Sequence, residues 1–295
     1  MITIFTPTYN RAYILPKLYE SLKRQSDKNF EWIVVDDGSN DATERLMSEW
    51  IAQEDDFPIR YIRQENSGKH IAINKGVSLA NTDWFFIVDS DDHIIDNAVQ
   101  KINEWIDDCT SSEFAGVAGT RISSENVTIG GEVLFDTPFV DCKNNERKKY
   151  GLGGDKAEVY KTSILKRYPF PKFGEEKFLS ECAVWDQVAL DGYKLRWFNS
   201  PLIVCTYLSD GLTAKVNKLE LENFEGYTYA TKIRLNAYNS LEHYRIIAQY
   251  INKGLHKRIE LRKIADNIGI SNSFAVFMAV IVEIKNLILG DNVKK

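Results

Sequence analysis

Cysteine and histidine are both scarce in this chain, with four of each among its 295 residues. The cysteines, at 109, 142, 182 and 205, lie far apart and show no paired spacing. They predict reduced, mostly buried thiols, as in a cytosolic protein, and not a disulfide framework. The histidines show no ligand spacing either, so no structural zinc site is expected.

Long apolar runs and a strong charge of one sign are also missing. No stretch of about 20 uninterrupted apolar residues occurs, so no clear transmembrane helix is predicted. The first residues, MITIFTPTYN, have neither a basic leader nor a long apolar core, and we expect a strand there, not a signal peptide. The formal net charge is only −5, and nothing in this balance predicts binding to nucleic acid. No G-x-G-x-x-G follows the first strand, which argues against a Rossmann dehydrogenase.

The pattern that is present alternates strands with helices. Apolar runs near residues 2–5, 30–35, 59–63 and 85–88 are separated by amphipathic stretches and short connections. This alternation predicts an α/β fold with a doubly wound, mostly parallel sheet covered on both faces. Beyond about residue 215 the pattern is wholly helical. We therefore expect a domain of residues 1–214 and a helical region of residues 215–295.

Further elements are predicted in the second half of the first domain. The spacing of apolar residues favours a helix over Lys177–Leu190. Two strands are expected next, at Lys194–Phe198 and Leu202–Tyr207.

Two of the predicted strands end in acidic clusters. The strand over 30–35 runs into Asp36-Asp37-Gly38-Ser39, and the strand over 85–88 runs into Asp89, Asp91 and Asp92. Carboxyl ends of parallel strands share one edge of the sheet, where ligands bind in open α/β folds. A polar loop at 66–69 leaves the third strand at the same edge. We therefore favour a binding site over three solvated loops.

Crowded carboxylates repel one another unless a cation lies among them. Hard oxygen ligands suit Mg²⁺ or Mn²⁺, and Mg²⁺ often takes one or two carboxylates plus substrate phosphates. The cluster thus predicts a divalent-metal site that handles a phosphorylated substrate. The alternative is a solvated acidic turn with Asp92 capping a following helix.

Four motifs, taken in order and at these separations, resemble the family 2 glycosyltransferases, nucleotide-diphosphosugar enzymes of the GT-A fold. They are TPTYNR at 6–11, VVDDGSND at 34–41, NSGKHIAINKG at 66–76 and FIVDSDD at 86–92. The resemblance covers roughly residues 1–210, and the C-terminal helices lie outside it.

The resemblance implies residues for the donor and for a metal. Thr6, Pro7 and Tyr9 would frame the nucleotide, and Asp36 or Asp37 would accept a hydrogen bond from the uracil imide. Lys69 would lie near the nucleotide or its diphosphate. The remaining positions come from the D-x-D stretch: Asp89 and Ser90 near the ribose or sugar, and Asp91, Asp92 and Asp89 as candidate ligands of Mn²⁺ or Mg²⁺.

An inverting transfer also needs a base, because the acceptor hydroxyl must lose its proton as it attacks. In the family this base is often carried by an E-D pair at a helix start. The matching stretch, FLSECAVWDQ, has Glu181 at the first position and Cys182 at the second. We predict Glu181 as the base, Asp155 of the GGDK loop as the second candidate and Asp186 as the third. The alternative for Glu181 is a first-turn carboxylate stabilised by the helix dipole.

Other residues near these motifs could have either a functional or a structural role. His70 and His93 flank the site, but such histidines are more often neutral than ligands. Lys69, between a glycine and a predicted helix start, favours an anion contact over a surface position. For Trp185, Trp197 and Tyr207 core packing is favoured over an acceptor pocket.

The C-terminal region combines a basic stretch, Lys253–Lys263, with an apolar one, Phe274–Val282. This combination suits a membrane surface. It also suits packing on the same domain or in a homodimer, and we favour packing.

The sequence therefore predicts a metal-dependent, inverting glycosyltransferase that moves a sugar from a nucleotide diphosphate, UDP by preference, to an acceptor hydroxyl. The resemblance implies a glycan or lipid-linked glycan acceptor in bacterial cell-surface polysaccharide synthesis, in the cytoplasm or peripherally at the inner face of the membrane. Two alternatives stay open. One is a sugar-phosphate nucleotidyltransferase, which would release pyrophosphate. The other is a non-catalytic nucleotide-sugar-binding scaffold, because Cys182 stands where the family has its second acid.

Overall fold

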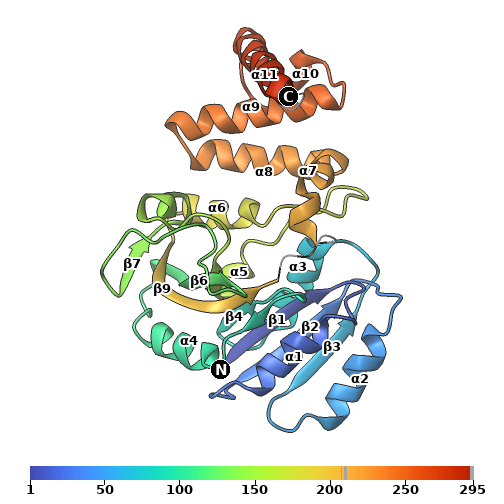
Figure 1. Ribbon diagram of the computed structural model, residues 1–295, viewed down its shortest axis with the longest axis vertical. Coiled ribbons are helices and arrows are strands. Elements are labelled where there is room, and N and C mark those ends of the chain that lie inside the picture. Colours follow the sequence, from blue (N-terminus) through green and yellow to red (C-terminus); the bar gives the residue numbers. More distant parts are fainter. Residues whose placement is uncertain (207, 209–210, 293–295) are drawn as a thin grey trace.

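The protein is described by a computed structural model that covers residues 1–206, 208 and 211–292 (Figure 1). Its strands are β1 (Ile2–Thr8), β2 (Phe30–Asp36), β3 (Ile59–Arg63), β4 (Trp84–Ile87), β5 (His93–Ile94), β6 (Phe114–Ser123), β7 (Phe139–Cys142), β8 (Ala157–Lys161) and β9 (Lys194–Cys205). Its helices are α1 (Leu15–Lys23), α2 (Thr43–Gln53), α3 (Lys69–Leu79), α4 (Ala98–Asp107), the 3-10 helix η1 (Asn144–Tyr150), α5 (Thr162–Leu165), α6 (Cys182–Leu190), α7 (Leu212–Glu222), α8 (Phe224–Ala237), α9 (Ser240–His256), α10 (Leu261–Ile268) and α11 (Asn272–Asn292).

Within the described residues the strands form one sheet of nine, in the order β3-β2-β1-β4-β8-β6-β9-β5, with β7 paired to β9. The first four strands in this order are parallel, as the sequence predicts. β8 then pairs antiparallel with both β4 and β6, and β6 pairs parallel with β9. The architecture is thus a mixed α/β sheet whose parallel half carries both acidic clusters at one edge.

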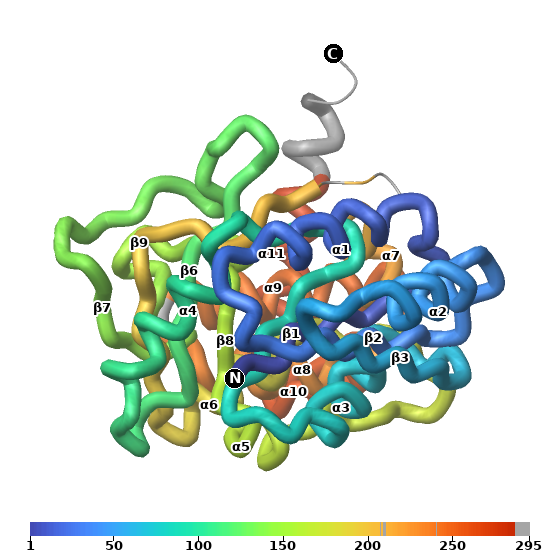
Figure 2. Tube along the Cα trace, turned by 90° about the horizontal axis from the view of Figure 1, so that it is seen from below, coloured from blue at the N-terminus to red at the C-terminus, as the bar shows by residue number. Residues whose placement is uncertain are grey.

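Alternating side chains build two cores, one on each face of the sheet. On β2, Phe30, Trp32 and Val34 pack with α1, α2 and α4, whereas Ile33 and Val35 pack with α3 and α6. Figure 2 shows α1 and α3 on opposite sides of β1 and β2. Every residue of β1 and β2 is buried, as expected for parallel strands covered on both faces.

Two predicted elements differ from the structure. The helix expected over Lys177–Leu190 begins only at Cys182. The segment before it is held by the Asn223 side chain, which accepts from the amides of Lys177 and Phe178 at 2.7 and 3.2 Å. The two predicted strands after it are one strand, β9. Tyr207, at the end of the second, lies outside the described residues.

The C-terminal helices have a core of their own, formed by α8, α9, α10 and α11 around Tyr250 and Ile264. α8 also contributes Ala230 to the core that contains α6. Figure 1 shows α9, α10 and α11 at one end of the long axis of the molecule, far from β2 and β3. Among the described residues, no helix alone has the length and apolar character to cross a membrane. α10 and residues Asn272–Asn286 of α11 pass that test together, but they are bent by 113°.

Candidate active site

Lys69 is the centre of the cluster at the carboxyl edge of the sheet. Its Nζ lies 2.6 Å from Asp89 Oδ1 and 2.7 Å from Glu181 Oε1. Lys69 is the first residue of α3, Asp89 follows β4, and Glu181 precedes the first residue of α6. Three residues that the sequence analysis took from three separate motifs therefore meet in one ion-paired group.

Arg121 of β6 is a second cation in this group, and it was not predicted. Its Nη1 lies 3.2 Å from Asp92 Oδ2 and 3.9 Å from Asp89 Oδ2, and its Nε donates to the Lys156 carbonyl at 2.9 Å. The only signal in the sequence is one arginine inside the otherwise apolar run FAGVAGTRIS. Burial acts to raise the pKa of Asp89, but Lys69 and Arg121 together hold that pKa below its ordinary value.

Asp92 is buried, and protein groups occupy both of its oxygens. Besides Arg121 on Oδ2, Thr206 donates its backbone N–H to Oδ1 at 3.0 Å. Burial and then the charge of Asp89 raise the pKa of Asp92 to about 6. Asp92 therefore ties the end of β9 to the cluster. It does not cap a helix, since α4 begins only at Ala98.

Asp91 differs from its neighbours because it makes no side-chain hydrogen bond or ion pair with the described residues. Burial, followed by the charge of Asp89, raises its pKa. The charges of Arg11 and Lys69 act to lower the pKa of Asp91 but do not outweigh burial and Asp89, so this carboxylate suits an added cation. No group of three or more His, Cys, Asp or Glu side chains in the described part of the chain could hold a metal ion. A cation at Asp91 would therefore need oxygens from a bound ligand, as Mg²⁺ commonly does.

Asp37 holds the loop that precedes α3. It accepts hydrogen bonds from the Ser67 and Gly68 amides and from Gln64 Nε2, each at 2.8 Å. Gly68 has φ +96°, and a Cβ there would lie 2.0 Å from the Lys177 carbonyl oxygen, so only glycine fits. Asp37 and Gly68 thus fix the position of Lys69.

Asp36 is buried and tied internally. It accepts from the Ser39 amide at 2.8 Å and from the Tyr61 hydroxyl at 2.5 Å. An open hollow of about 430 Å³ lies beside these loops, lined by Gly38, Arg63, Gln64, Glu65 and Asn66. Its size suits a nucleobase or a similar small group.

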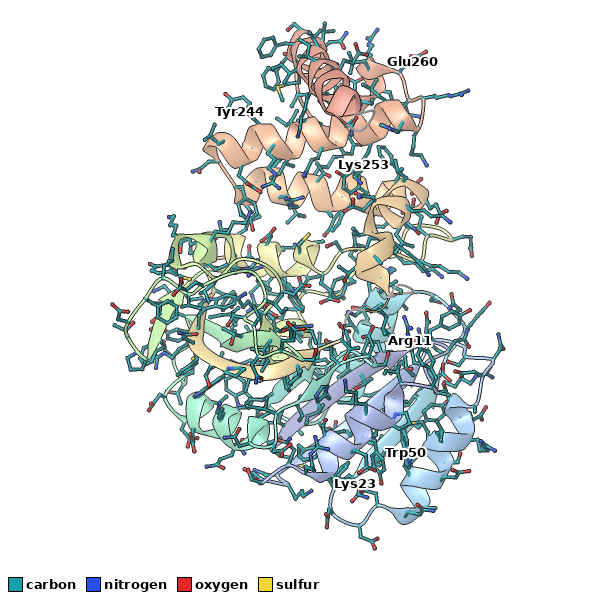
Figure 3. All side chains as sticks on the ribbon, in the orientation of Figure 1. Arg11, Lys23, Trp50, Tyr244, Lys253 and Glu260 are labelled. Atoms are coloured by element: carbon teal, nitrogen blue, oxygen red, sulfur yellow. The ribbon has the colours of Figure 1, made fainter. Side chains whose placement is uncertain are left out.

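The predicted residues of the first loop divide between core and surface. The Thr6 hydroxyl is buried and accepts from Trp32 Nε1 at 3.0 Å, so this side chain packs in the core with α1 and α2. Pro7 is also buried, and Tyr9 is exposed. Figure 3 shows Arg11, from the same loop, at the edge of the sheet nearer the C-terminal helices. Ser90 is buried between Asp89 and Asp91.

The three candidate bases lie in different surroundings. Glu181 contacts Lys69, as described above. Asp155 is exposed, and its side chain has no hydrogen bond or ion pair with the described residues. Asp186 is buried and accepts from Asn144 Nδ2 at 2.7 Å and from the Tyr238 hydroxyl at 3.1 Å. Burial raises its pKa. Asp186 therefore serves the junction with η1 and α8, and only Glu181 belongs to the ion-paired group.

Both flanking histidines are neutral near pH 7. Burial lowers the pKa of His70 to about 4, and its ring meets Phe170 edge-on. Burial and then the charges of Lys17 and Arg24 lower the pKa of His93 to about 4 as well. In the described residues neither Nδ1 has a hydrogen-bond partner.

Two of the predicted aromatic residues pack in the core. Trp185 stacks on Tyr160 with ring centroids 4.5 Å apart. Trp197 is fully buried, and its Nε1 donates to the Cys142 carbonyl at 3.0 Å.

Several solved structures share this fold. S. aureus TarS 1-349 in complex with UDP-GlcNAc matches with a TM-score of 0.62 and 19 % identity, over 86 % of this chain and 72 % of that one. The mannosyltransferase PcManGT from Pyrobaculum calidifontis, in complex with GDP-Man and Mn²⁺, matches with a TM-score of 0.57 and 16 % identity, over 97 % and 74 %. At these identities the likeness shows the fold alone.

The family model for glycosyl transferase family 2 matches residues 3–168. Because this is more than half of the chain, the chain belongs to that family. GlyA of Streptococcus pneumoniae, a glycosyltransferase, is 28 % identical over 66 % of this chain. A Campylobacter jejuni GalNAc(5)-diNAcBac-PP-undecaprenol beta-1,3-glucosyltransferase is 24 % identical over 80 % of it. The matches cover 30 % of GlyA and 74 % of the Campylobacter enzyme, so this chain corresponds to under a third of GlyA.

Proposed function

We propose that this chain transfers a sugar from a UDP donor to an acceptor hydroxyl with inversion at the anomeric carbon. The observation that carries the proposal is the contact of Lys69 with both Asp89 and Glu181, at 2.6 and 2.7 Å. This contact puts a cation for the leaving diphosphate beside a carboxylate that can accept the acceptor's proton. The reaction needs both groups at one place.

In the proposed step the acceptor oxygen forms a bond to the anomeric carbon while the bond from that carbon to the diphosphate breaks. Glu181 takes the hydroxyl proton, and UDP leaves with its negative charge stabilised by Lys69. A single displacement from the opposite face inverts the configuration. Burial raises the pKa of Cys182 to about 11, so its neutral thiol does not replace the family's second acid.

For the metal we assign Asp91, together with oxygens of the donor diphosphate. The lack of any described partner for Asp91 and its raised pKa support this role. A bound Mn²⁺ or Mg²⁺ would supply further positive charge to the leaving group. Asp92, held by Arg121 and Thr206, is the weaker candidate ligand.

We assign the nucleobase to the hollow beside Asp37. A carboxylate has about four lone-pair sites, and Asp37 uses three, so one imide N–H can still be accepted. The TarS complex with UDP-GlcNAc supports UDP, whereas the PcManGT complex with GDP-Man makes GDP the competitor to test.

For the acceptor we infer a glycan or lipid-linked glycan of a bacterial cell surface, used on the cytoplasmic side of the membrane. The undecaprenol-linked substrate in the name of the Campylobacter relative supports this inference. A Proteus mirabilis relative named an undecaprenyl-phosphate 4-deoxy-4-formamido-L-arabinose transferase supports it too.

The test is calorimetric titration of UDP, GDP and CDP, with Mn²⁺ and with EDTA. We expect UDP to bind with Mn²⁺ and to bind at least tenfold more weakly with EDTA or in Asp91→Ala. Asp155→Asn, which removes an exposed carboxylate, is the control. If no nucleotide binds under any condition, the proposal is wrong. Binding without UDP release from any UDP-sugar would favour the scaffold instead.

A further inference from the structure

One face of α11 is apolar and is not covered by any described residue. Ala275, Met278 and Ala279 pack in the core shared with α9 and α10, and Val282 is also buried. The opposite side carries five large apolar side chains, each between 41 % and 60 % exposed: Val276, Phe277, Val280, Ile281 and Ile284. Their spacing of one and three residues places them in a single stripe along the helix. We call these five residues the α11 stripe.

Aromatic residues widen this surface. Phe274 stacks on Phe277 with ring centroids 6.4 Å apart, and Tyr244 of α9 meets Phe274 edge-on at 6.1 Å. Tyr244 is itself half exposed. Figure 3 shows Tyr244 and Glu260 at the end of the molecule that α11 occupies. A continuous exposed apolar surface of this kind marks an interaction site and not ordinary solvent-facing helix.

The charge of the same helical unit differs from that of the whole chain. Residues 240–292 contain seven Lys and Arg against five Asp and Glu, whereas the chain contains 37 against 42. Arg258, Arg262 and Lys263 are exposed, and their side chains make no ion pair or hydrogen bond with the described residues. They lie on α10 and the turn before it, and α10 packs against α11. The α11 stripe and these basic side chains therefore belong to the same helical unit.

We propose that α11 lies on an anionic phospholipid surface, with the α11 stripe among the acyl chains and Arg258, Arg262 and Lys263 at the lipid phosphates. An amphipathic helix with basic flanks binds such a surface by both apolar burial and charge. A second copy of the chain fits less well, because residues 240–292 of that copy carry the same excess of Lys and Arg over Asp and Glu. The inference does not depend on the proposed transfer reaction.

The test is sedimentation of the full chain with vesicles of phosphatidylcholine alone and with one-third phosphatidylglycerol added. We expect binding to the mixed vesicles that weakens with salt. Phe277→Ser/Ile281→Ser should lower the partition coefficient about tenfold or more, and Arg262→Glu/Lys263→Glu should lower it by a similar factor. Matched controls are Val127→Ser/Leu134→Ser for exposed apolar residues and Lys75→Glu/Lys149→Glu for exposed lysines.

Light scattering of the same samples tests the alternative that the α11 stripe binds a second copy of the chain. Loss of vesicle binding in both stripe and basic variants, with both controls unchanged, supports the proposal. The wild type failing to bind mixed vesicles would overturn it, as would equal binding by all variants. A dimer that dissociates in Phe277→Ser/Ile281→Ser, without vesicle binding by the wild type, would assign the surface to a second copy.

Discussion

Lys69 contacts two carboxylates at once, so its removal takes a cation from both Asp89 and Glu181. We expect Lys69→Met to weaken UDP binding at least tenfold, because a charge-assisted contact to phosphate contributes roughly 1.5–3 kcal/mol. Calorimetry measures the affinity. Lys75→Met, in the same helix but exposed, should leave it unchanged. Equal affinity in both variants would remove Lys69 from the donor site.

Two isosteric substitutions test which carboxylate is the catalytic base. Glu181→Gln should lower kcat by roughly 10²–10⁴, the usual contribution of a positioned general base, while UDP affinity stays within about twofold. Asp155→Asn should change kcat by less than about threefold, because that side chain contacts no described group. Single-turnover assays with saturating donor give both values. The opposite order would transfer the role to Asp155.

His70 gives the protein a predictable dependence on pH. Its folded pKa of about 4 lies below the unfolded value of 6.5. The unfolded state therefore binds more protons between these values, and stability falls as pH drops from 6.5 towards 4. When the pH is lowered from 7 to 4.5, we expect the free energy of unfolding of His70→Asn to fall by roughly 2 kcal/mol less than that of the wild type. Urea unfolding at the two pH values measures this difference, and equal losses would contradict it.

At the scale of elements, the turn into α3 depends on one glycine. Gly68 and Gly192 both have φ +96°, but a Cβ on Gly68 would lie 2.0 Å from the Lys177 carbonyl, whereas nothing lies within 4 Å of one on Gly192. Gly192→Ala should lower the free energy of unfolding only by the backbone strain, about 1–2 kcal/mol. Gly68→Ala should lower the free energy of unfolding by more than this. It should also abolish UDP binding, because Lys69 moves with the turn. Thermal unfolding and calorimetry together check both variants. Similar costs with intact binding would contradict this account.

At the scale of the whole molecule, the C-terminal core is separate from the site. Tyr250 is fully buried and stacks on Phe224 and Tyr227 at 5.3 and 5.6 Å. Tyr250→Ala should destabilise the helical unit by about 3–5 kcal/mol, as large aromatic truncations do. UDP affinity should stay within about twofold, because the ion-paired group lies before residue 182. Proteolysis of the C-terminal helices measures the stability of the helical unit, and calorimetry measures the UDP affinity. Tyr244→Ala, at an exposed position, is the control. Parallel loss of UDP binding would show that the two parts are coupled.

The boundary near residue 215 remains a prediction. α8 contributes to both the core around α6 and the C-terminal core. Asp186 and Tyr238 join the two parts by a partly buried hydrogen bond of 3.1 Å. The helical unit is therefore anchored to the sheet domain through α8, whichever residue is taken as the boundary.

Much of the fold follows from the sequence alone. Apolar runs at residues 2–5, 30–35, 59–63 and 85–88 predict parallel strands, and the structure has β1 to β4 there. The acidic clusters come directly after two of these strands, so the shared edge was predictable from strand direction alone. The family followed from the same local motifs, since their order and spacing are properties of the sequence.

The tertiary structure decided which charges meet. Arg121 lies 29 residues from Asp92, and Lys69 lies 112 residues from Glu181, and no local pattern encodes such pairs. Their contacts depend on the insertion of β8 between β4 and β6 and on the start of α6 at Cys182. Burial and contacts then distinguish carboxylates that look alike in sequence: Asp92 and Asp186 are tied to protein groups, whereas the Asp91 side chain has no ion pair with a described residue. The sequence by itself determined the fold and the edge that carries the site, because these depend on local periodicity. The role open to each carboxylate depends on desolvation and distance, which exist only once the chain has folded.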